Sequence, residues 1–238
     1  MESLKNKIAL ITGSGGAVGS FVTRSLLNAG CKTALVYRSD KHAETLSKLR
    51  EEYGDQVLII QADLATESDA GNTVDRCLSE FGQVDFLVNP VGGWLGGKRV
   101  HEHSFDDLEK MLNIDLKPTF NILQAVLPAM VNGGRGKIIN FVSMAIFDQQ
   151  KNNAIYAASK SAVASLTKAV AQEYGAENIQ AFALAPSTIN SEANRQAMPD
   201  ADHSTWVDLD EITQAIVYLC ASGDSLSGTT LKFTGTLH

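Results

Sequence analysis

The chain has 238 residues, of which 44% are hydrophobic and 20% are charged, and its formal net charge at pH 7 is −7. This length and composition fit a globular α/β protein, and the negative charge argues against a surface that binds nucleic acid or anionic membranes. Cys31, Cys77 and Cys220 are widely spaced and form no C-x-x-C pair, so we expect no disulfide, no zinc site and a cytoplasmic location. No apolar stretch approaches the roughly 20 residues that cross a bilayer, so we expect no membrane partner.

Short apolar runs alternate with longer segments of helical periodicity from one end of the chain to the other. In chain order, strands are expected at residues 8–12, 33–37, 57–61, 86–89, 137–142, 179–184 and 229–233. Helices are expected between them at residues 17–29, 41–53, 67–81, 104–131, 154–174 and 208–221. Several of the apolar runs are continuous, which is typical of strands buried on both faces.

This alternation predicts an α/β fold with right-handed crossovers. We expect a single Rossmann-like doubly wound domain over residues 1–238, with a seven-stranded, mostly parallel sheet and helices on both faces. No linker, low-complexity tract or internal repeat divides the chain. In such a sheet the ligand crevice lies at the carboxyl ends of the strands, so functional residues are expected directly after them.

The first predicted strand runs directly into a glycine-rich turn that precedes a helix. Glycines let the backbone approach a pyrophosphate closely, and the helix N-terminus adds free N–H groups and the positive end of its dipole. After the first strand of a βαβ unit, such a turn indicates dinucleotide binding. The turn residues expected to bind the cofactor are Gly13, Ser14, Gly15, Gly16, Val18 and Gly19.

The charge after the second predicted strand indicates which nicotinamide cofactor fits. A carboxylate there would bind ribose hydroxyls, whereas a cation suits a 2′-phosphate. The chain reads Tyr37-Arg38-Ser39, and the nearest acid, Asp40, is expected to lie past the pocket. The guanidinium of Arg38 can bind phosphate or stack on adenine, so these three residues are expected to favour NADP(H), with NAD(H) as the alternative. The other reading of Arg38 is a solvated surface arginine.

Tyr156 and Lys160 lie four residues apart in a predicted helix, and Ser143 lies thirteen positions before Tyr156. Residues i and i+4 share one face of a helix, so the phenol and the ammonium would lie side by side. A nearby cation favours the ionised form of a phenol, which suits a tyrosine to proton transfer. The spacing also occurs by chance, so its interpretation depends on the rest of the chain.

Together these residues resemble the short-chain dehydrogenase/reductase family, and the resemblance covers essentially the whole chain. Its further marks are Asp63-Leu64, Asn89-Pro90-Val91-Gly92 and Ala185-Pro186-Ser187, which follow the third, fourth and sixth predicted strands. The resemblance implies a homo-oligomer assembled through long helices, usually a homotetramer, with a dimer as the alternative. It adds to the expected cofactor contacts Asp63, Leu64, Asn89, Pro90, Val91, Gly92, Tyr156, Lys160, Pro186, Ser187, Thr188 and Ile189.

The resemblance also implies an oxidoreductase that transfers a hydride between nicotinamide and a carbonyl or alcohol group of a small molecule. By the family pattern, Tyr156 would be the general acid/base and Ser143 would hydrogen-bond the substrate oxygen. Lys160 would hold the nicotinamide ribose and lower the pKa of the tyrosine. Proton donation from Tyr156 to a developing alkoxide is physically sound for this reaction.

Three positions depart from the family pattern. Pro90 replaces an asparagine and removes a backbone donor, and Ala17 replaces a glycine, which a negative φ would tolerate. Asp115 stands where the family has a catalytic asparagine whose backbone carbonyl holds a water. A carboxylate near Lys160 would favour the ammonium form and retune the proton relay, or Asp115 is a structural substitute. Asn113 would point to a different helix face and is a poor replacement.

Two segments are expected to shape the substrate site: the glycine loop that carries Trp94, and a mobile lid near residues 188–207. Both are similar to segments of the quinonoid dihydropteridine reductases, a branch of the same family. Trp94 would stack on a flat heteroaromatic substrate, or the tryptophans would simply pack the lid down. The substrate-binding candidates are Trp94, Ser143, Asn194, Met198 and Trp206.

Two further readings stay open. A β-ketoacyl carrier-protein reductase shares the core motifs and would use basic residues at its entrance, for which Lys98, Arg99 and Arg195 are candidates unless they are simply solvated. A dinucleotide-binding protein that has lost catalysis is favoured by Asp115 and Pro90. The intact serine, tyrosine and lysine set argues against it.

Overall fold

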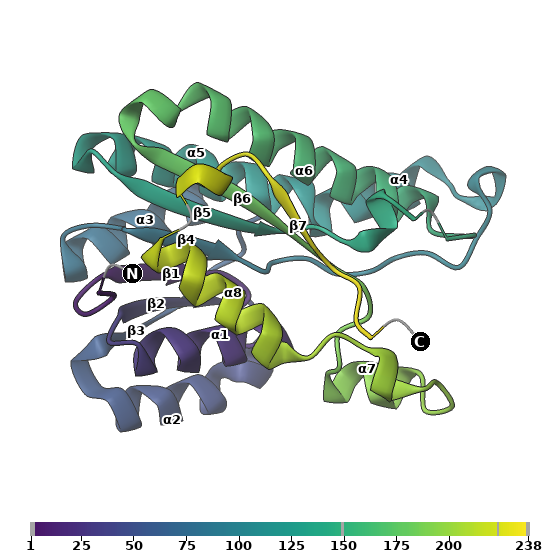
Figure 1. Ribbon diagram of the computed structural model, residues 1–238, viewed down its shortest axis with the longest axis horizontal. Helices are drawn as coiled ribbons and strands as arrows, with labels where there is room; N and C mark the ends of the chain where they lie inside the picture. The colour runs from purple at the N-terminus through teal and green to yellow at the C-terminus, as the bar shows by residue number, and fades with distance from the viewer. Residues whose placement is uncertain (1–2, 149, 223, 237–238) are drawn as a thin grey trace.

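The computed structural model describes residues 3–148, 150–222 and 224–236 (Figure 1). Its seven-stranded sheet has the order β3-β2-β1-β4-β5-β6-β7, and every pair of neighbouring strands is parallel. The strands are β1 (Ile8–Ile11), β2 (Lys32–Tyr37), β3 (Val57–Gln61), β4 (Phe86–Asn89), β5 (Gly136–Phe141), β6 (Ile179–Pro186) and β7 (Thr230–Phe233). All seven predicted strands are confirmed, and the sheet is parallel throughout rather than mostly parallel.

The sheet separates two apolar cores. The helices of one face are α1 (Ala17–Asn28), α2 (Ala43–Tyr53) and α8 (Leu209–Ala221), and those of the other are α3 (Glu67–Phe81), α5 (Leu116–Gly133) and α6 (Ala154–Glu173). Successive residues of β1 belong to different cores, since Ile11 packs on the α1 side and Leu10 on the α5 side. Because helices cover both faces, the strands are continuous apolar runs in the sequence.

The helix predicted over residues 104–131 is two helices, α4 (Phe105–Ile114) and α5, which meet at Asp115. The backbone of Asp115 has φ −110° and ψ −60°, and its carbonyl accepts a hydrogen bond from the hydroxyl of Thr119 at 2.8 Å. Pro118, in the first turn of α5, has no N–H to donate to the carbonyl of Ile114. The prediction of one helix was wrong because the apolar periodicity continues through this break.

The segment predicted as a lid, residues 188–207, leaves the carboxyl end of β6 and contains a short helix, α7 (Glu192–Ala197), that was not predicted. The two ends of the segment pair with each other. The N–H of Val207 donates to the carbonyl of Thr188 at 2.9 Å, and the N–H of Asn190 donates to the carbonyl of Val207 at 2.8 Å. In Figure 1, α7 lies beyond the carboxyl ends of the strands. That the segment moves as a lid stays a prediction.

The three cysteines are free thiols buried in the two cores. Cys31 and Cys220 lie in the core beneath α1 and α8, and Cys77 lies in the core beneath α3 and α5. Burial raises the pKa of Cys31 and that of Cys77 to about 12, and it raises the pKa of Cys220 as well. The thiols therefore stay protonated at neutral pH.

In the parts of the chain that the structure describes, no helix is both long enough and apolar enough to cross a membrane. Nor do the described residues include a group of three or more histidine, cysteine, aspartate or glutamate side chains that could hold a metal ion.

Candidate active site

The predicted functional residues gather at the carboxyl ends of the central strands. The glycine turn follows β1, Arg38 follows β2, Gly92 follows β4 and Ser143 follows β5. The helix α6 begins at this edge, carries Tyr156 and Lys160 in its first two turns, and runs back over one face of the sheet. Parallel strands end at one edge of a sheet, which is why motifs far apart in the sequence meet there.

The glycine turn packs tightly against the start of α1. Gly13 has φ +53°, and its carbonyl accepts the N–H of Gly16 at 2.9 Å. A β-carbon at Gly19 would overlap the carbonyl of Gly13, so no larger residue fits there. Ser14 is buried, and its hydroxyl donates to the carbonyl of Val36 at 2.9 Å, which fixes the turn to β2. Ala17 is not among the described residues with positive φ, so its methyl group causes no strain.

Arg38 and Asp40 both lie just after β2, beside the end of β3. Arg38 is exposed, and its carbonyl accepts a hydrogen bond from Gln61 at 3.3 Å. The amide of Gln61 also donates to Asp40 at 2.6 Å, so this carboxylate is held at the end of β3. His42, which was not predicted as a site residue, lies against the glycine turn: its ring occupies the space where a β-carbon of Gly15 would lie. In the sequence, the adjoining pair Lys41-His42 was the signal for further cationic or imidazole groups after β2.

Asn89 and the turn after it join the strand ends. The side-chain oxygen of Asn89 accepts from the hydroxyl of Thr12 at 2.6 Å, and its amide donates to Asn140 at 2.9 Å and to Thr119 at 3.1 Å. Asn89 is therefore committed to a buried network between β1, β4, β5 and α5. Val91 lies against Gly13, since a β-carbon at Gly13 would be 3.4 Å from Cα of Val91.

The remaining predicted cofactor contacts lie at the ends of β3 and β6. Asp63 closes its own turn by accepting the N–H of Ala65 at 3.1 Å, and the carbonyl of Leu64 accepts from Asn121 at 2.9 Å. After β6, the N–H of Ser187 donates to the carbonyl of Phe233 at 2.8 Å. These residues follow strands that end at the same edge of the sheet as the glycine turn, and the side chain of Leu64 is buried in the core beneath α3 and α5.

Lys160 forms a buried ion pair with Asp115. Its ammonium lies 3.3 Å from Oδ1 of Asp115, and the two side chains are 7% and 0% exposed. The ammonium also donates to the carbonyl of Phe141 at 3.2 Å, and the same Oδ1 accepts the N–H of Gly93 at 3.0 Å. A β-carbon at Gly92 would lie 2.5 Å from Oδ1 and 2.7 Å from the ammonium, so the glycine makes room for the pair.

Burial and the ion pair act in opposite directions on the pKa of each partner. Burial lowers the pKa of Lys160, while the carboxylate of Asp115 raises it. Burial raises the pKa of Asp115, while Lys160 and the N–H of Gly93 lower it. Asn113 is exposed on the outer side of α4, as expected for a residue on another face of the helix.

Tyr156 is partly buried beside Ser143. Burial raises the pKa of Tyr156, and so does the charge of Asp115, while the hydroxyl of Ser143 lowers it. The net direction is upward, opposite to the lowering expected from the neighbouring lysine, because burial outweighs the hydrogen bond with Ser143. The hydroxyl of Ser143 also accepts the N–H of Ala145 at 3.2 Å, which orients the serine at the end of β5.

The structure does not bring the substrate-binding candidates into one cluster of contacts. The indole of Trp94 donates to Oδ1 of Asn153 at 3.0 Å, just before α6. Asn194 and Trp206 make their contacts within the predicted lid: the amide of Asn194 donates to the carbonyl of Ile189 at 2.8 Å, and the ring of Trp206 lies 4.4 Å from that of His203. Met198, also in the lid segment, is 41% exposed.

Comparisons with known proteins agree with this fold. A model of the short chain dehydrogenase family matches residues 7–202. An uncharacterized oxidoreductase of Staphylococcus saprophyticus is 28% identical over 221 residues, which cover 92% of each chain. A gluconate 5-dehydrogenase from Burkholderia cenocepacia, solved with NADP and tartrate, is 30% identical with a TM-score of 0.89 and covers 98% of this chain and 96% of its own.

A second solved structure, an NAD+-bound xylitol dehydrogenase, is 25% identical with a TM-score of 0.88 and covers 99% of this chain and 100% of its own. The chain therefore belongs to the short-chain dehydrogenase family, and it is an oxidoreductase that acts on alcohol or carbonyl groups with a nicotinamide dinucleotide.

The described residues fit such a dinucleotide. Gly13, Gly15 and Gly16 carry no side chain, the hydroxyl of Ser14 points to β2, and the N-terminus of α1 follows directly. Free N–H groups at a helix N-terminus and a backbone bare of side chains suit a pyrophosphate. Tyr156, at the start of α6, lies at the same edge of the sheet.

Proposed function

We propose that this protein is an NADP(H)-dependent carbonyl reductase with Tyr156 as its general acid/base. The observation that carries the proposal is that Ser143, Tyr156 and Lys160 meet beyond β5, at the same strand edge as the glycine turn. When bound, the nicotinamide ring supplies the hydride or accepts it. Tyr156 would give its phenolic proton to the oxygen of the reduced carbonyl, and Ser143 would hold that oxygen by a hydrogen bond.

The proposed roles of Lys160 and Asp115 follow from their ion pair. Lys160 would hold the nicotinamide ribose, and Asp115 would keep the lysine charged in a buried site. The glycine turn, Arg38 and the strand-end residues predicted above would bind the rest of the dinucleotide. An assay of NADPH and NADH oxidation over a panel of aldehydes, ketones, β-ketoacyl thioesters and quinonoid dihydropterin tests the function. Absence of turnover throughout the panel, with tight cofactor binding, would support the non-catalytic reading instead.

The quinonoid dihydropterin in this panel tests the second candidate function. Trp94 favours it, because 61% of this flat side chain is exposed near the start of α6. Turnover of the pterin above that of simple carbonyls would support a dihydropteridine reductase.

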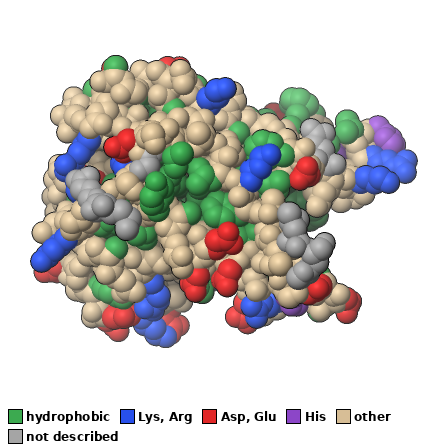
Figure 2. Space-filling model, in the orientation of Figure 1, with side chains coloured by type: hydrophobic (Ala, Val, Ile, Leu, Met, Phe, Trp, Pro, Cys, Tyr) green, Lys and Arg blue, Asp and Glu red, His purple; other side chains and the backbone are tan. Residues whose placement is uncertain are grey.

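The carrier-protein alternative has weaker support, since one of its proposed cations, Lys98, is paired with Asp107 at 3.0 Å. Figure 2 shows cationic and histidine side chains at the right-hand tip of the molecule.

Replacement of Arg38 by alanine is expected to weaken NADPH binding about 10- to 100-fold and to leave NADH binding nearly unchanged. A hydrogen bond to a charged group contributes about 1.5–3 kcal/mol, and only NADPH carries the 2′-phosphate. Titration of cofactor fluorescence measures both constants. Lys48→Ala is the matched control, because this exposed cation is paired with Glu44 on α2. Equal losses for both cofactors would contradict the assignment of Arg38 to the 2′-phosphate.

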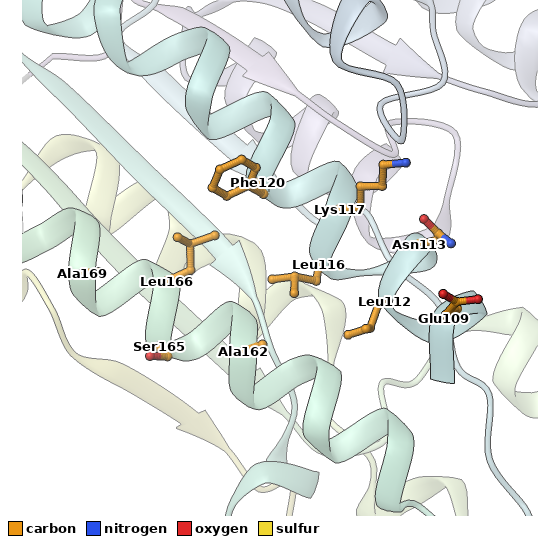
Figure 3. Close-up of a pocket in the computed structure, with 10 residues that line it drawn as sticks. All are labelled: Glu109, Leu112, Asn113, Leu116, Lys117, Phe120, Ala162, Ser165, Leu166 and Ala169. Carbon is orange, nitrogen blue, oxygen red and sulfur yellow. The ribbon is translucent and has the colours of Figure 1, made fainter. Parts of the chain in front are cut away.

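We also propose a homo-oligomer in which a second copy packs on the outer face of α4, α5 and α6. A groove of about 700 Å³ opens on this face (Figure 3). Its lining includes the apolar side chains of Leu112, Leu116 and Leu166, and Phe120 beside them is 50% exposed. Exposed apolar grooves of this kind mark protein–protein contacts.

Phe120→Glu is expected to convert the assembled protein to monomers, because it would bury a charge in an apolar interface. Light scattering coupled to size-exclusion chromatography measures the mass in solution. Phe21→Glu is the matched control, since Phe21 is a similarly exposed residue of α1 on the opposite face of the sheet. A monomeric wild-type protein, or an assembly that survives Phe120→Glu, would count against this interface.

A further inference from the structure

The connection after β4 joins two parts of the active site. Its residues 92–97, Gly92-Gly93-Trp94-Leu95-Gly96-Gly97, are called the strap here. One end of the strap contacts the ion pair of Asp115 and Lys160. The other end contacts the two residues that precede α6, Asn152 and Asn153.

At its first end the strap approaches the ion pair without any side chain in between. The N–H of Gly93 donates to Oδ1 of Asp115 at 3.0 Å. Gly92 has φ +150°, and any β-carbon there would collide with both Asp115 and Lys160. A β-carbon at Gly93 would lie 3.0 Å from Cγ2 of Ile114. The strap therefore supplies a backbone donor to a carboxylate that is fully buried.

At its other end the strap is hydrogen-bonded to the start of α6. The indole N–H of Trp94 donates to Oδ1 of Asn153 at 3.0 Å, and the N–H of Gly97 donates to the carbonyl of Asn152 at 2.9 Å. A β-carbon at Gly96 would lie 2.9 Å from Oδ1 of Asn153. These contacts hold the strap so close to Asn152 and Asn153 that a side chain at position 96 would force its neighbours to shift.

Asn153 occupies a position from which asparagine ordinarily caps a helix. Its side-chain oxygen makes no bond to the first turn of α6, and its φ and ψ of −114° and 16° lie outside the extended region usual for that role. The oxygen is instead the acceptor for Trp94. Tyr156 lies three residues further on, so the bond between Trp94 and Asn153 ties the strap to the turn that carries the phenol.

We infer that Trp94 and Asn153 are positioning residues: their hydrogen bond anchors the strap and thereby holds Tyr156 in register with the ion pair of Asp115 and Lys160. The inference rests on the proposed function of Tyr156. It gives Trp94 a role in addition to substrate stacking, because the bond uses the indole N–H and leaves the ring 61% exposed. Misplacement of a reacting group by about 1 Å costs about 100-fold in rate, which sets the scale of the effect.

Two variants separate the hydrogen bond from the aromatic surface. Trp94→Phe keeps a ring and removes the N–H, and Asn153→Ala removes the acceptor. Each is expected to lower kcat by about 10- to 100-fold, and the double variant is expected to be no slower than the slower single variant. Val100→Ala, in the same connection and 72% exposed, is the control with unchanged kcat. Thermal melting excludes variants that fail to fold.

The pH profile distinguishes positioning from a general structural role. The N–H of Gly93 lowers the pKa of Asp115, so a loosened strap raises that pKa and Asp115 takes up a proton at higher pH. The acid limb of kcat is therefore expected to move to higher pH in both variants. Additive losses of kcat in the double variant, or unchanged pH profiles in the single variants, would overturn the inference. A rise in KM for flat substrates in Trp94→Phe alone would assign Trp94 to the substrate instead.

A second readout does not need activity, so it separates failure of the inference from failure of the proposed function. The chain has two tryptophans, and Trp206→Phe leaves Trp94 as the sole tryptophan, which is excited selectively over the tyrosines. In that background, Asn153→Ala is expected to increase acrylamide quenching of Trp94 and to shift its emission to the red, because the indole loses its acceptor and moves into water. Unchanged fluorescence would show that the strap is not anchored by this bond.

Discussion

Tyr156→Phe is expected to lower kcat by about 10²- to 10⁴-fold, the range that a positioned general acid or base contributes. The substitution removes the phenolic oxygen that would give or take the proton and leaves the ring in place. Burial and the charge of Asp115 raise the pKa of Tyr156, so the wild-type tyrosine stays protonated, and ready to serve as an acid, well above neutral pH. Steady-state rates with the best carbonyl of the panel measure the loss.

Cofactor binding is the control in this experiment. Tyr156→Phe is expected to bind NADPH with little change, as measured by cofactor fluorescence, because the glycine turn and Arg38 are untouched. Tyr218→Phe removes the hydroxyl of a tyrosine that is 47% exposed on α8, and it is expected to leave kcat unaltered. Full activity of Tyr156→Phe would rule out the assigned proton donor.

Asp115→Ala is expected to lower the free energy of unfolding by about 3–5 kcal/mol, the usual cost of removing one partner of a buried ion pair. The ammonium of Lys160 would be left in a site that is 7% exposed, with only the carbonyl of Phe141 as a described hydrogen-bond acceptor. Urea-induced unfolding measures the change. Asp115→Ala combined with Lys160→Met removes both charges and is expected to be more stable than Asp115→Ala alone. Equal stability of the two variants would mean that the unpaired ammonium of Lys160 carries no energetic cost.

The conservative variant Asp115→Asn tests the same pair through pH. The negative charge of Asp115 raises the pKa of Lys160 and that of Tyr156, whereas burial acts on Lys160 in the opposite direction. Loss of this charge lowers both pKa values. Carbonyl reduction requires both groups protonated, so its alkaline limb is expected to move to lower pH. An alkaline limb at the same pH in Asp115→Asn would indicate that Asp115 is a structural substitute for asparagine.

Much of the fold was predictable because both faces of the sheet are covered. Because helices cover each side, the central strands are largely continuous apolar runs. Residues such as Leu10 and Ile11 can therefore be recognised as buried strand residues without knowing which core they join. The break at Asp115 was not predictable from periodicity. One distorted residue hardly shifts the apolar pattern of two consecutive helices, and the clue lies in Pro118 and the hydroxyl of Thr119.

The candidate site was predictable only where its residues follow strands or share a helix face. Tyr156 and Lys160 could be placed together because helical geometry relates i to i+4. The ring of His42 against Gly15, and the acceptor that Asn153 provides for Trp94, depend on two loops meeting in space. Local spacing carries no information about such meetings.

The buried cysteines make it possible to measure how fast each apolar core opens, by thiol labelling. Cys31, Cys77 and Cys220 are each at most 1% exposed and protonated, so a thiol reagent reaches them only when the surrounding core opens. Because Cys77 lies on one side of the sheet and the other two lie on the opposite side, mass spectrometry of labelled peptides compares the opening rates of the two cores. Equal rates would mark global unfolding, and faster labelling of one side would identify the core that opens first.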